Sequence, residues 1–532
     1  MRFSQRALGA LLAVAAGAAC ATTADAAHKP RGAKDPARTS AKLQKAVKVG
    51  DDRSGIRQHL RRLQEIADAN GNTRATGTQG HVDSAQYVIG QLARTKYWNV
   101  TTQPFDAIVF TEQAPATLSA PGAPAWAEGT DYGTMEFSGA GAVTDAPVSV
   151  IDFTEPTEEA SASSAGCEDT DFPADLAGKI AVIQRGTCDF GVKARNAQAH
   201  GAAGVIIFNE GTLGNPDRQG LLSGTLGEEI SIPVLESTYA VGRYFVDNPG
   251  STASLSASGL TEHKATYNVI AESKTGNPDR TVISGAHLDS VPAGPGINDD
   301  GTGTATQLET ALQMAKQNVR TPNRIRFIWF SGEEQGLLGS TYYADNLSEE
   351  QIGQTLGMLD FDMLASPNYA LQIYDGDGSE FEAAGPDGSG AIEKTFQDFF
   401  DARGLPTERI AFDGRSDYDE FTVVGIPAGG IATGAEVHKT LQEQQWWGGT
   451  VSDGVEGQYD PCYHLACDSY GINGHPDNIN DTALDVMSDA VVDSVVRLAN
   501  LDGPLAPPAA AARSVAPQGT QDALYHGDLL VR

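Results

Sequence analysis

The sequence predicts an α/β protein with a mixed, mostly parallel sheet that helices cover on both faces, and with a β-rich domain inserted into it. After residue 261, short apolar runs alternate with helical patterns, as is typical of such a sheet. Across residues 112–260, Pro- and Gly-rich turns and short β-branched runs replace helical periodicity. We therefore expect residues 51–111 and 261–502 to form the α/β domain, with residues 112–260 as the insert.

Residues 1–26 have the pattern of a secretory signal peptide. Two arginines precede an apolar run through Ala19, and the small-residue motif Ala24-Asp25-Ala26 follows. A lipoprotein anchored through Cys20 is the alternative, but the usual leucine three residues earlier is absent. No other apolar run is long enough to span a bilayer. We therefore expect a secreted, extracellular protein with no membrane partner.

The remaining segments of the chain are polar stretches and helices. Residues 27–50 contain almost no large apolar side chains, so we expect a linker or propeptide that cannot order itself. Residues 478–501 predict a closing helix, and residues 503–532, rich in Pro and Ala, predict a flexible tail. Two helices that pack without chemistry are predicted by the apolar positions Ile56, Leu60, Leu63 and Ile66, and by Val82, Ala85, Val88, Ile89 and Leu92.

Charge and cysteine content limit the environment and the partners. The sequence carries 69 acidic and 37 basic residues, a net charge of −32, which disfavours nucleic acid as a partner and favours a soluble monomer. Four cysteines follow the predicted signal, an even number that suits an oxidising compartment. They allow three pairings, and sequence proximity favours two disulfides, Cys167–Cys188 and Cys462–Cys467.

Polar side chains follow the first apolar run, residues 281–286. His287 and Asp289 come next and point the same way from the end of a buried strand. Such a histidine can bind zinc while the carboxylate receives its other N–H, although a histidine satisfied by a carboxylate without metal gives the same pattern. Asp299 and Asp300 follow in a Gly-bounded loop before a helical run, and two adjacent carboxylates would repel a phosphate. This loop therefore favours a cation.

Two further apolar runs lead to carboxylates. Residues 324–330 precede Glu333 and Glu334, and residues 356–361 precede Asp362. Open α/β sheets bind their ligands at the carboxyl ends of the strands, so these carboxylates are candidates for one shared site. Consecutive glutamates are also common on solvated helices, and it is the position after a strand that distinguishes this pair.

The motifs occur in the order found in a known family. They resemble those of the secreted bacterial di-zinc aminopeptidases, and the likeness covers roughly residues 54–112 and 262–502. Inside the insert, residues 176–186, 190–199 and 204–209 resemble the protease-associated domain. The motifs that carry the family resemblance are His287-x-Asp289-Ser290, Asn298-Asp299-Asp300-Gly301, Glu333-Glu334-x-Gly336-Leu337-Leu338-Gly339-Ser340, Phe361-Asp362-Met363 and Cys462-Tyr463-His464.

The resemblance implies the zinc-exopeptidase fold, two Zn²⁺ ions per chain and removal of the N-terminal residue from peptides or proteins. In the family pattern, Asp299 bridges the two zinc ions. His287 and Asp362 complete the ligands of one ion, and Glu334 and His464 complete those of the other. Two zinc ions a few ångströms apart require such a bridging carboxylate with terminal ligands on each side.

Further roles follow from the same resemblance. Glu333 is the expected general base, because it is not itself a ligand. Tyr463 is an expected donor to the oxyanion of the intermediate, with simple packing as the alternative. Arg415 lies in a stretch that lines the substrate amine site in the family. On the closing helix, Asp485 and Asp489 are a like-charge pair that a Ca²⁺ ion would bridge, as relatives suggest, or that simply faces solvent.

Several alternatives stay open at this point. A carboxypeptidase on the same fold would need a basic cluster that we do not find in the sequence, a glutaminyl cyclase would need only one metal, and an inactive receptor-like member would have lost ligands. Serine hydrolysis is disfavoured because no G-x-S-x-G motif occurs. The insert either shapes substrate access or is purely structural. Asp419 and Glu420 depart from the family pattern and either favour basic N-terminal residues or face solvent.

Overall fold

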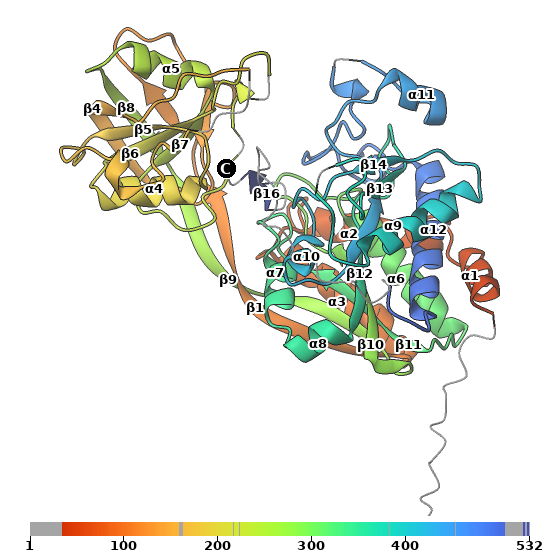
Figure 1. Cartoon of the computed structure of the whole chain (residues 1–532). Helices are drawn as coiled ribbons and strands as arrows, with labels where there is room; N and C mark the ends of the chain where they lie inside the picture. Colours follow the sequence, from red (N-terminus) through yellow and green to blue (C-terminus); the bar gives the residue numbers. More distant parts are fainter. Residues whose placement is uncertain are drawn as a thin grey trace, which may run out of the picture.

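The computed structural model describes residues 35–158, 163–215, 218–222, 224–381, 383–452, 454–505, 525–526 and 529–530 (Figure 1). The predicted signal peptide and the lipoprotein alternative at Cys20 lie outside these residues. Within the predicted tail, β16 (Tyr525–His526) and β17 (Leu529–Leu530) form a short antiparallel pair. None of the described helices is long and apolar enough to cross a membrane.

The largest sheet has eight strands in the order β1-β9-β11-β10-β12-β15-β13-β14. Strands β11, β10, β12 and β15 run parallel, whereas β9 and β13 pair antiparallel with β11 and β15. The three apolar runs predicted as strands lie in β10, β11 and β12. The strands are β1 (Trp98–Glu112), β9 (Gly259–Ser273), β10 (Asn277–His287), β11 (Asn323–Phe330), β12 (Thr355–Phe361), β13 (Gln372–Tyr374), β14 (Glu408–Ile410) and β15 (Ala428–Ala432).

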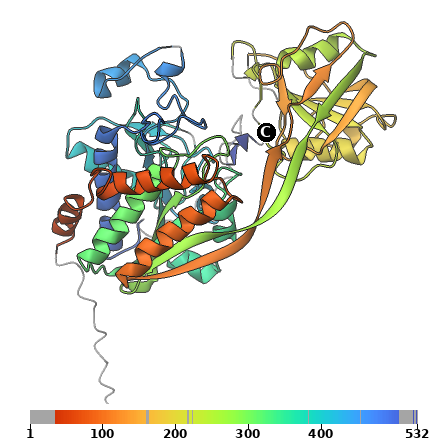
Figure 2. The ribbon, with the colours of Figure 1, turned by 180° about the vertical axis from the view of Figure 1, so that it is seen from behind.

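Helices cover both faces of this sheet, because alternate strand residues point to opposite sides (Figures 1 and 2). Val282 and Trp329 pack with one set of helices, α2, α3, α6, α9 and α12, and Ile283 and Phe330 pack with α7, α8 and α10 on the other face. The predicted fold class is confirmed. The helices are α2 (Gly55–Ala69), α3 (Gln79–Thr95), α6 (Gly301–Lys316), α7 (Leu338–Asp345), α8 (Glu349–Gln354), α9 (Ser389–Asp401), α10 (Asp419–Val423), α11 (Leu441–Trp447), α12 (Asp481–Ala499) and a 3-10 turn, Val455–Gly457.

The insert contains the second sheet, with seven strands in the order β2-β8-β4-β5-β6-β7-β3. Ile183 and Ile207 pack towards α4, and Val182 and Phe208 pack towards α5 on the opposite face. The insert therefore has an apolar core of its own. Its elements are β2 (Thr117–Ser119), β3 (Tyr132–Thr134), β4 (Gly141–Ile151), a 3-10 turn (Asp169–Asp171), β5 (Ile180–Gln184), α4 (Phe190–Ala199), β6 (Gly204–Phe208), β7 (Val234–Ser237), α5 (Tyr239–Asp247) and β8 (Thr252–Ala257).

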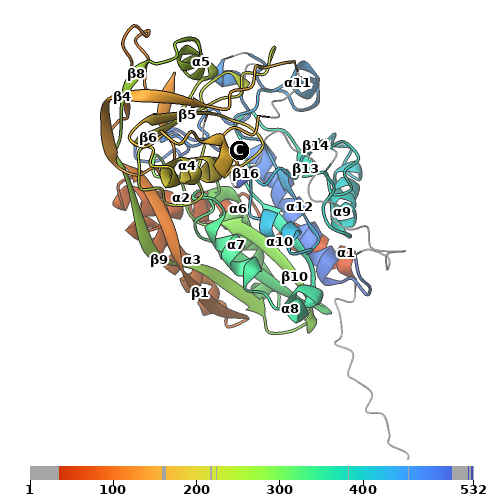
Figure 3. The ribbon, with the colours of Figure 1, turned by 60° about the vertical axis from the view of Figure 1, so that its left-hand side comes forward.

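A long antiparallel ribbon, β1 with β9, joins the two sheets (Figure 3). Its pairing runs without interruption from Trp98 opposite Ser273 to Glu112 opposite Gly259. The burial of β1 does not alternate regularly along the strand, so its period-2 signal is weak and the sequence did not predict it. The predicted domain limits at 111/112 and 260/261 lie at the insert end of this ribbon.

The expectation that residues 27–50 cannot order themselves is wrong for part of that segment. Residues Pro36–Gln44 form helix α1, which packs against α12. Leu43 and Val47 are buried in the same apolar cluster as the closing helix. Docking on an existing core, together with the hydrogen bond of Ser40 to Asp493, therefore orders a segment whose composition alone predicts disorder.

Candidate metal centre

Three neighbouring parallel strands end at the same edge of the larger sheet. His287 is the last residue of β10, and Asp362 follows the last residue of β12. Glu333 and Glu334 come shortly after β11, and both are buried. Because the carboxyl ends of parallel strands meet at one edge, residues far apart in the sequence gather here, as the sequence predicted.

Asp299 lies between two histidines. Its Oδ1 is 3.1 Å from Nε2 of His287, and its Oδ2 is 3.3 Å from Nε2 of His464. Nε2 of His464 is also 3.1 Å from Oε2 of Glu334, and Nε2 of His287 is 3.5 Å from Oδ1 of Asp362. A carboxylate with one oxygen towards each of two ligand groups has the arrangement of a bridging metal ligand.

The donor atoms of these residues fit zinc. Histidine nitrogens and carboxylate oxygens are ordinary zinc ligands. His287, Asp299 and Glu334 each offer a ligand atom within 4.8 Å of the other two. Oε1 of Glu334 and Oδ1 of Asp362 are buried without a hydrogen-bond partner among the described residues. Such oxygens are costly to bury unless a cation contacts them, so the site has the chemistry to hold metal ions.

Burial and the neighbouring groups shift the pKa values of Glu333 and Asp299 in opposite directions. Burial raises the pKa of Glu333 well above its ordinary value, and the negative charge of Asp362 adds to that shift. Burial would also raise the pKa of Asp299, but hydrogen bonds from His287 and His464 outweigh it and lower the pKa. The cluster therefore combines a carboxyl that is able to hold a proton with one that stays ionised.

Asp289 lies beside His287 and Glu333. Its Oδ1 is 3.8 Å from Nδ1 of His287, which is longer than a hydrogen bond. The same oxygen accepts the backbone N–H of Glu333 at 3.4 Å. The sequence led us to expect a hydrogen bond from the His287 imidazole to Asp289, and at 3.8 Å this bond is not made. The Asp289 oxygen accepts from the Glu333 backbone instead. The role of Asp289 in orienting His287 stays a prediction.

Asp300 joins the ends of two strands to the start of α6. Its Oδ1 accepts the backbone N–H groups of Gly303 at 2.8 Å and Met363 at 3.1 Å, and its Oδ2 accepts that of His287 at 3.2 Å. A Cβ atom at Gly303 would lie 1.9 Å from the carbonyl oxygen of Phe361, so only glycine allows α6 to begin this close to β12. The loop that carries the preceding aspartate is therefore held rigidly.

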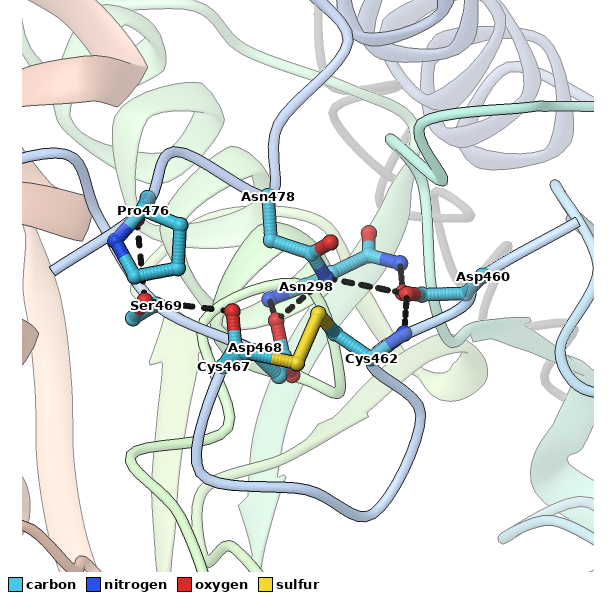
Figure 4. Close-up of a disulfide and its surroundings, with 8 residues drawn as sticks. All are labelled: Asn298, Asp460, Cys462, Cys467, Asp468, Ser469, Pro476 and Asn478. Atoms are coloured by element: carbon cyan, nitrogen blue, oxygen red, sulfur yellow. Dashed lines mark hydrogen bonds between the residues drawn. A yellow bond between two sulfur atoms is a disulfide. The ribbon is translucent and has the colours of Figure 1, made fainter. Parts of the chain in front are cut away.

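A buried polar network that the sequence did not reveal surrounds Asn298, the residue before Asp299 (Figure 4). Asp468 accepts the backbone N–H groups of Asn298 and Asp299 at 2.8 and 3.0 Å. The amide of Asn478 donates to Asp468 at 2.9 Å and to Asp460 at 3.0 Å. This network fixes the backbone of Asp299 through its N–H group.

The two predicted disulfides, Cys167–Cys188 and Cys462–Cys467, are confirmed. Their Cα atoms are 5.8 and 5.3 Å apart. The first lies in the insert. The second closes the short loop that carries His464, next to the polar network (Figure 4). The loop that supplies the last candidate ligand is therefore constrained both covalently and by hydrogen bonds.

Arg74 is a second supporting residue that the sequence did not reveal. Its fully buried guanidinium donates to the carbonyl oxygens of Leu288, Pro295 and Gly296, with 2.7 Å to Pro295. Burial lowers the pKa of Arg74, while the charge of Asp289 opposes that shift. Arg74 comes from the segment between α2 and α3, and it holds the turn between β10 and the loop that carries the central aspartate.

Tyr463 and Arg415 lie together beside the cluster. The ring of Tyr463 stacks on that of His464 with centroids 3.9 Å apart. Arg415 lies 3.4 Å from the Tyr463 hydroxyl and makes a two-pronged ion pair with Glu436 at 2.8 and 3.3 Å. Arg415 and Tyr463 line a cavity of about 450 Å³ that Asp299 also lines. The structure thus places both predicted substrate-contacting residues at a cavity that opens onto the cluster.

Asp485 and Asp489 lie on α12, beside α1 and apart from this cavity. They line a surface pocket with residues of the N-terminal segment. Asp489 makes an ion pair with Arg403 at 3.6 Å. Burial raises the pKa of Asp489 to about 6, with Arg403 opposing the shift. One carboxylate is therefore partly compensated by a cation of the chain itself, and calcium at this position stays a prediction.

Comparison with known proteins identifies relatives over most of the chain. Residues 268–495 match the model of peptidase family M28, and residues 143–244 match that of the PA domain. An aminopeptidase of Pseudomonas aeruginosa (strain UCBPP-PA14) is 43% identical over 444 residues, which cover 82% of this chain and 79% of the relative. Leucine aminopeptidase 2 of Trichophyton tonsurans is 36% identical over 91% of both chains.

A solved structure has a similar fold. The aminopeptidase from Aneurinibacillus sp. strain AM-1 superposes with a TM-score of 0.64 at 26% identity, covering 88% of this chain and 98% of that one. The family resemblance predicted from the motifs is confirmed by these matches, and the match within residues 112–260 agrees with the resemblance of the insert to a protease-associated domain. This chain belongs to peptidase family M28.

Proposed function

We propose that this chain is a secreted aminopeptidase that holds two zinc ions and hydrolyses the peptide bond after the N-terminal residue of its substrate. The observation that carries the proposal is the position of Asp299, with one oxygen towards His287 and the other towards His464. The relatives named as aminopeptidases support the reaction. The signal-like N-terminus and the two disulfides support an oxidising, extracellular location.

The five candidate ligands divide into two sets around Asp299. His287 and Asp362 would complete one zinc site, and Glu334 and His464 the other. Two zinc ions held in this way would lower the pKa of a water molecule to about 7 and withdraw electron density from the peptide carbonyl. Within each set, the histidine nitrogen and the carboxylate oxygen lie 3.5 Å and 3.1 Å apart, which is close enough for one cation to contact both atoms.

Glu333 is the group that we assign to proton transfer. Glu333 belongs to neither ligand set, and its Oε2 lies 3.9 Å from Nε2 of His287. Its raised pKa suits a carboxyl that takes a proton from water and delivers it to the leaving amine. Tyr463 is assigned as the hydroxyl donor to the oxyanion of the intermediate. Arg415, beside that hydroxyl, keeps it in place.

A carboxypeptidase is the second candidate, and the cavity disfavours it. Binding a terminal carboxylate would require a cation that is not already neutralised. The two arginines that line the cavity each have a carboxylate partner, Arg409 with Glu393 at 2.6 Å and Arg415 with Glu436 at 2.8 Å. A cavity lined by more carboxylates than arginines suits the positive α-amine of a free N-terminus.

The test separates the two adjacent glutamates. With leucyl-p-nitroanilide as substrate, Glu333→Gln should lower kcat by about 10²- to 10⁴-fold, the usual worth of a general base. The variant should keep two zinc ions per chain by elemental analysis, because it loses no ligand. Glu334→Gln should instead lower the zinc content, and added zinc should restore part of its activity.

Two controls guard the interpretation. An N-acetylated substrate should resist the wild-type enzyme, because an aminopeptidase needs the free amine. The two glutamine variants are identical in the atoms changed, so a difference between them reports position alone. If Glu333→Gln lost zinc while Glu334→Gln kept both ions, the assigned roles would be wrong. If the zinc-loaded wild-type protein cleaved only blocked substrates, the aminopeptidase proposal would fail.

A further inference from the structure

The cavity beside the metal cluster contains a pair of glutamates at some distance from the candidate ligands. Glu408 is on β14, and Glu443 is on α11. Strand β14 is three strands away from β12, whose end carries Asp362, which corresponds to roughly 14 Å across a sheet. One cavity therefore extends from the metal cluster to a second acidic position.

The two glutamates share a hydrogen-bonded position. Their side chains hydrogen-bond with each other, the Tyr459 hydroxyl donates to Oε1 of Glu408 at 3.3 Å, and Gln372 donates to the same oxygen at 2.8 Å. Burial, with Glu443 adding to it, raises the pKa of Glu408 to about 8. Burial would also raise the pKa of Glu443, but the hydrogen bonds with Glu408 and with the Thr440 backbone lower it. The pair therefore holds at least one negative charge at neutral pH.

No cation of the described chain neutralises this pair directly. Neither glutamate makes an ion pair with an arginine or lysine among the residues that the structure places. The Lys439 ammonium interacts electrostatically with both glutamates, but its hydrogen bonds go to the carbonyl oxygens of Tyr369 at 2.7 Å and Gly448 at 3.0 Å. Both cavity arginines have other carboxylate partners. Hydrogen bonds and the charge of Lys439 act on this pair, and no direct ion pair within the described chain prevents a cation in the cavity from contacting it.

The same cavity also has apolar surface. Tyr374, Phe381 and Ile410 contribute aromatic and aliphatic surface to the same cavity. A cavity that offers both apolar surface and a carboxylate pair matches a long side chain with an aliphatic stem and a cationic head. Lysine and arginine have this shape, whereas leucine would leave the acidic end without a partner.

We propose that this cavity receives the side chain of the N-terminal residue of the substrate and that Glu408 and Glu443 select lysine or arginine at that position. The inference rests on the proposed aminopeptidase function and names its substrate class. It also relocates a hypothesis made from the sequence, because Asp419 and Glu420 are not among the residues that line the cavity. The acidic residues placed for recognition come from β14 and α11 instead of α10.

The first test uses the unmodified, zinc-loaded enzyme. Lysyl-p-nitroanilide and norleucyl-p-nitroanilide have the same unbranched stem and differ in the terminal ammonium group. Because a hydrogen bond to a charged group is worth about 1.5–3 kcal/mol, kcat/KM for the lysyl substrate should exceed that for the norleucyl substrate by about 10- to 100-fold. Equal values, or a norleucyl preference, would overturn the inference and leave the aminopeptidase proposal intact, since both substrates would still be cleaved. Cleavage of neither would contradict the aminopeptidase proposal instead.

The second test assigns the preference to the acidic pair. Glu408→Gln should lower the lysyl-to-norleucyl ratio of kcat/KM at least about fivefold. Glu408→Lys should make a glutamyl substrate better than the lysyl one, because the charge at this position is then positive. Glu420→Gln is the matched control, because it removes a nearby glutamate charge outside the cavity and should leave the ratio within about twofold. A ratio that fell with Glu420→Gln and not with Glu408→Gln would return the preference to α10 and overturn the assignment. The ratio cancels any loss of folded protein, so a poorly folded variant still gives an answer.

Discussion

Strand β5 of the insert and the strands that lead to the metal cluster end in chemically different ways. In the insert, β5 ends at Gln184, whose buried amide has all of its partners. Its Oε1 accepts the Thr154 N–H at 3.0 Å, and its Nε2 donates to the carbonyl oxygens of Thr154 at 3.0 Å and Glu210 at 2.9 Å. In the larger sheet, the strand ends lead to Glu334 and Asp362, which each have a buried oxygen without a hydrogen-bond partner among the described residues.

This difference separates a structural strand end from a functional one. A buried polar group that lacks a partner costs about 1–3 kcal/mol, and a charged one costs more. The insert avoids that cost at Gln184, and at the end of β7 it leaves a neutral hydroxyl, that of Ser237, without a partner among the described residues. The edge of the larger sheet concentrates the cost in one cluster, where a cation from outside the chain would remove it. A buried carboxylate therefore indicates a functional site only when its oxygens also lack hydrogen-bond partners within the chain.

A matched pair of isosteric substitutions tests this contrast, and we expect it to give the largest effect. Asp468→Asn replaces one acceptor oxygen with an NH₂ group that would face a backbone N–H of Asn298 or Asp299. Zinc affinity and kcat/KM should fall by about 10- to 100-fold, as is typical when a partner that orients a metal ligand is lost. Elemental analysis and initial rates measure the two quantities.

Gln184→Glu is the reverse exchange in the insert. It places a carboxylate oxygen against the carbonyl oxygens of Thr154 and Glu210, so the free energy of unfolding should fall by about 1–3 kcal/mol. Zinc content and kcat/KM should stay at the wild-type values in the folded fraction. Loss of zinc in Gln184→Glu, or full activity with full zinc in Asp468→Asn, would show that the two strand ends do not differ as argued.

Local patterns were sufficient to predict which groups gather at the carboxyl ends of the central strands. His287, Glu334 and Asp362 each follow an apolar run, and the sheet brings the ends of those runs together without further information. The residues that hold the loops could not be found in this way. Arg74 lies more than 200 residues before the turn whose carbonyls it binds, and Asp468 lies 169 residues after the aspartate whose N–H it accepts. Neither has a neighbour in sequence that reveals its contact.

The same limit explains the errors made outside the site. Composition correctly describes residues 27–50 as polar, but only the folded core shows where Leu43 and Val47 dock. The long strand β1 is stabilised mainly by its pairing with β9, which begins nearly 150 residues later in the chain. Glu408 belongs to a three-residue strand at the sheet edge, and its contact with Glu443 is made through tertiary structure alone.

The two disulfides give a second test of the contrast, with a smaller effect. Replacing both cysteines of the Cys167–Cys188 bridge by serine should lower the free energy of unfolding of the insert by about 3 kcal/mol, because the bridge closes a separation of 21 residues. The bridge Cys462–Cys467 spans 5 residues and should contribute about 2 kcal/mol. Chemical denaturation followed by insert and α/β-domain probes would measure both.

Activity should rank the two bridges in the opposite order. The shorter loop carries His464 and Tyr463, so its serine variant should bind zinc less tightly and turn over more slowly, whereas the insert variant should keep its zinc content and kcat. A double-serine variant at 462 and 467 with wild-type zinc affinity would mean that the hydrogen bonds of Asp468 position this loop without help from the bridge.

The smallest effect is expected on α12, where Asp485 and Asp489 are one turn apart. The charge of Asp485 adds to the raised pKa of Asp489, so the two carboxylates repel each other even though Arg403 lies 3.6 Å from one of them. In calcium-free buffer, Asp485→Asn should therefore stabilise the protein by about 0.2–0.5 kcal/mol, the size of a like-charge pair at this spacing. If a calcium ion binds both carboxylates, Asp485→Asn destabilises the protein instead, because the variant loses a ligand.

Thermal unfolding of both proteins with and without millimolar calcium distinguishes the two cases. The calcium prediction requires the wild-type midpoint to rise with the ion and the variant midpoint to stay unchanged. If both midpoints are insensitive to calcium and the variant is the more stable protein in each buffer, the pair is a solvated, partly compensated repulsion and the ion has no place there.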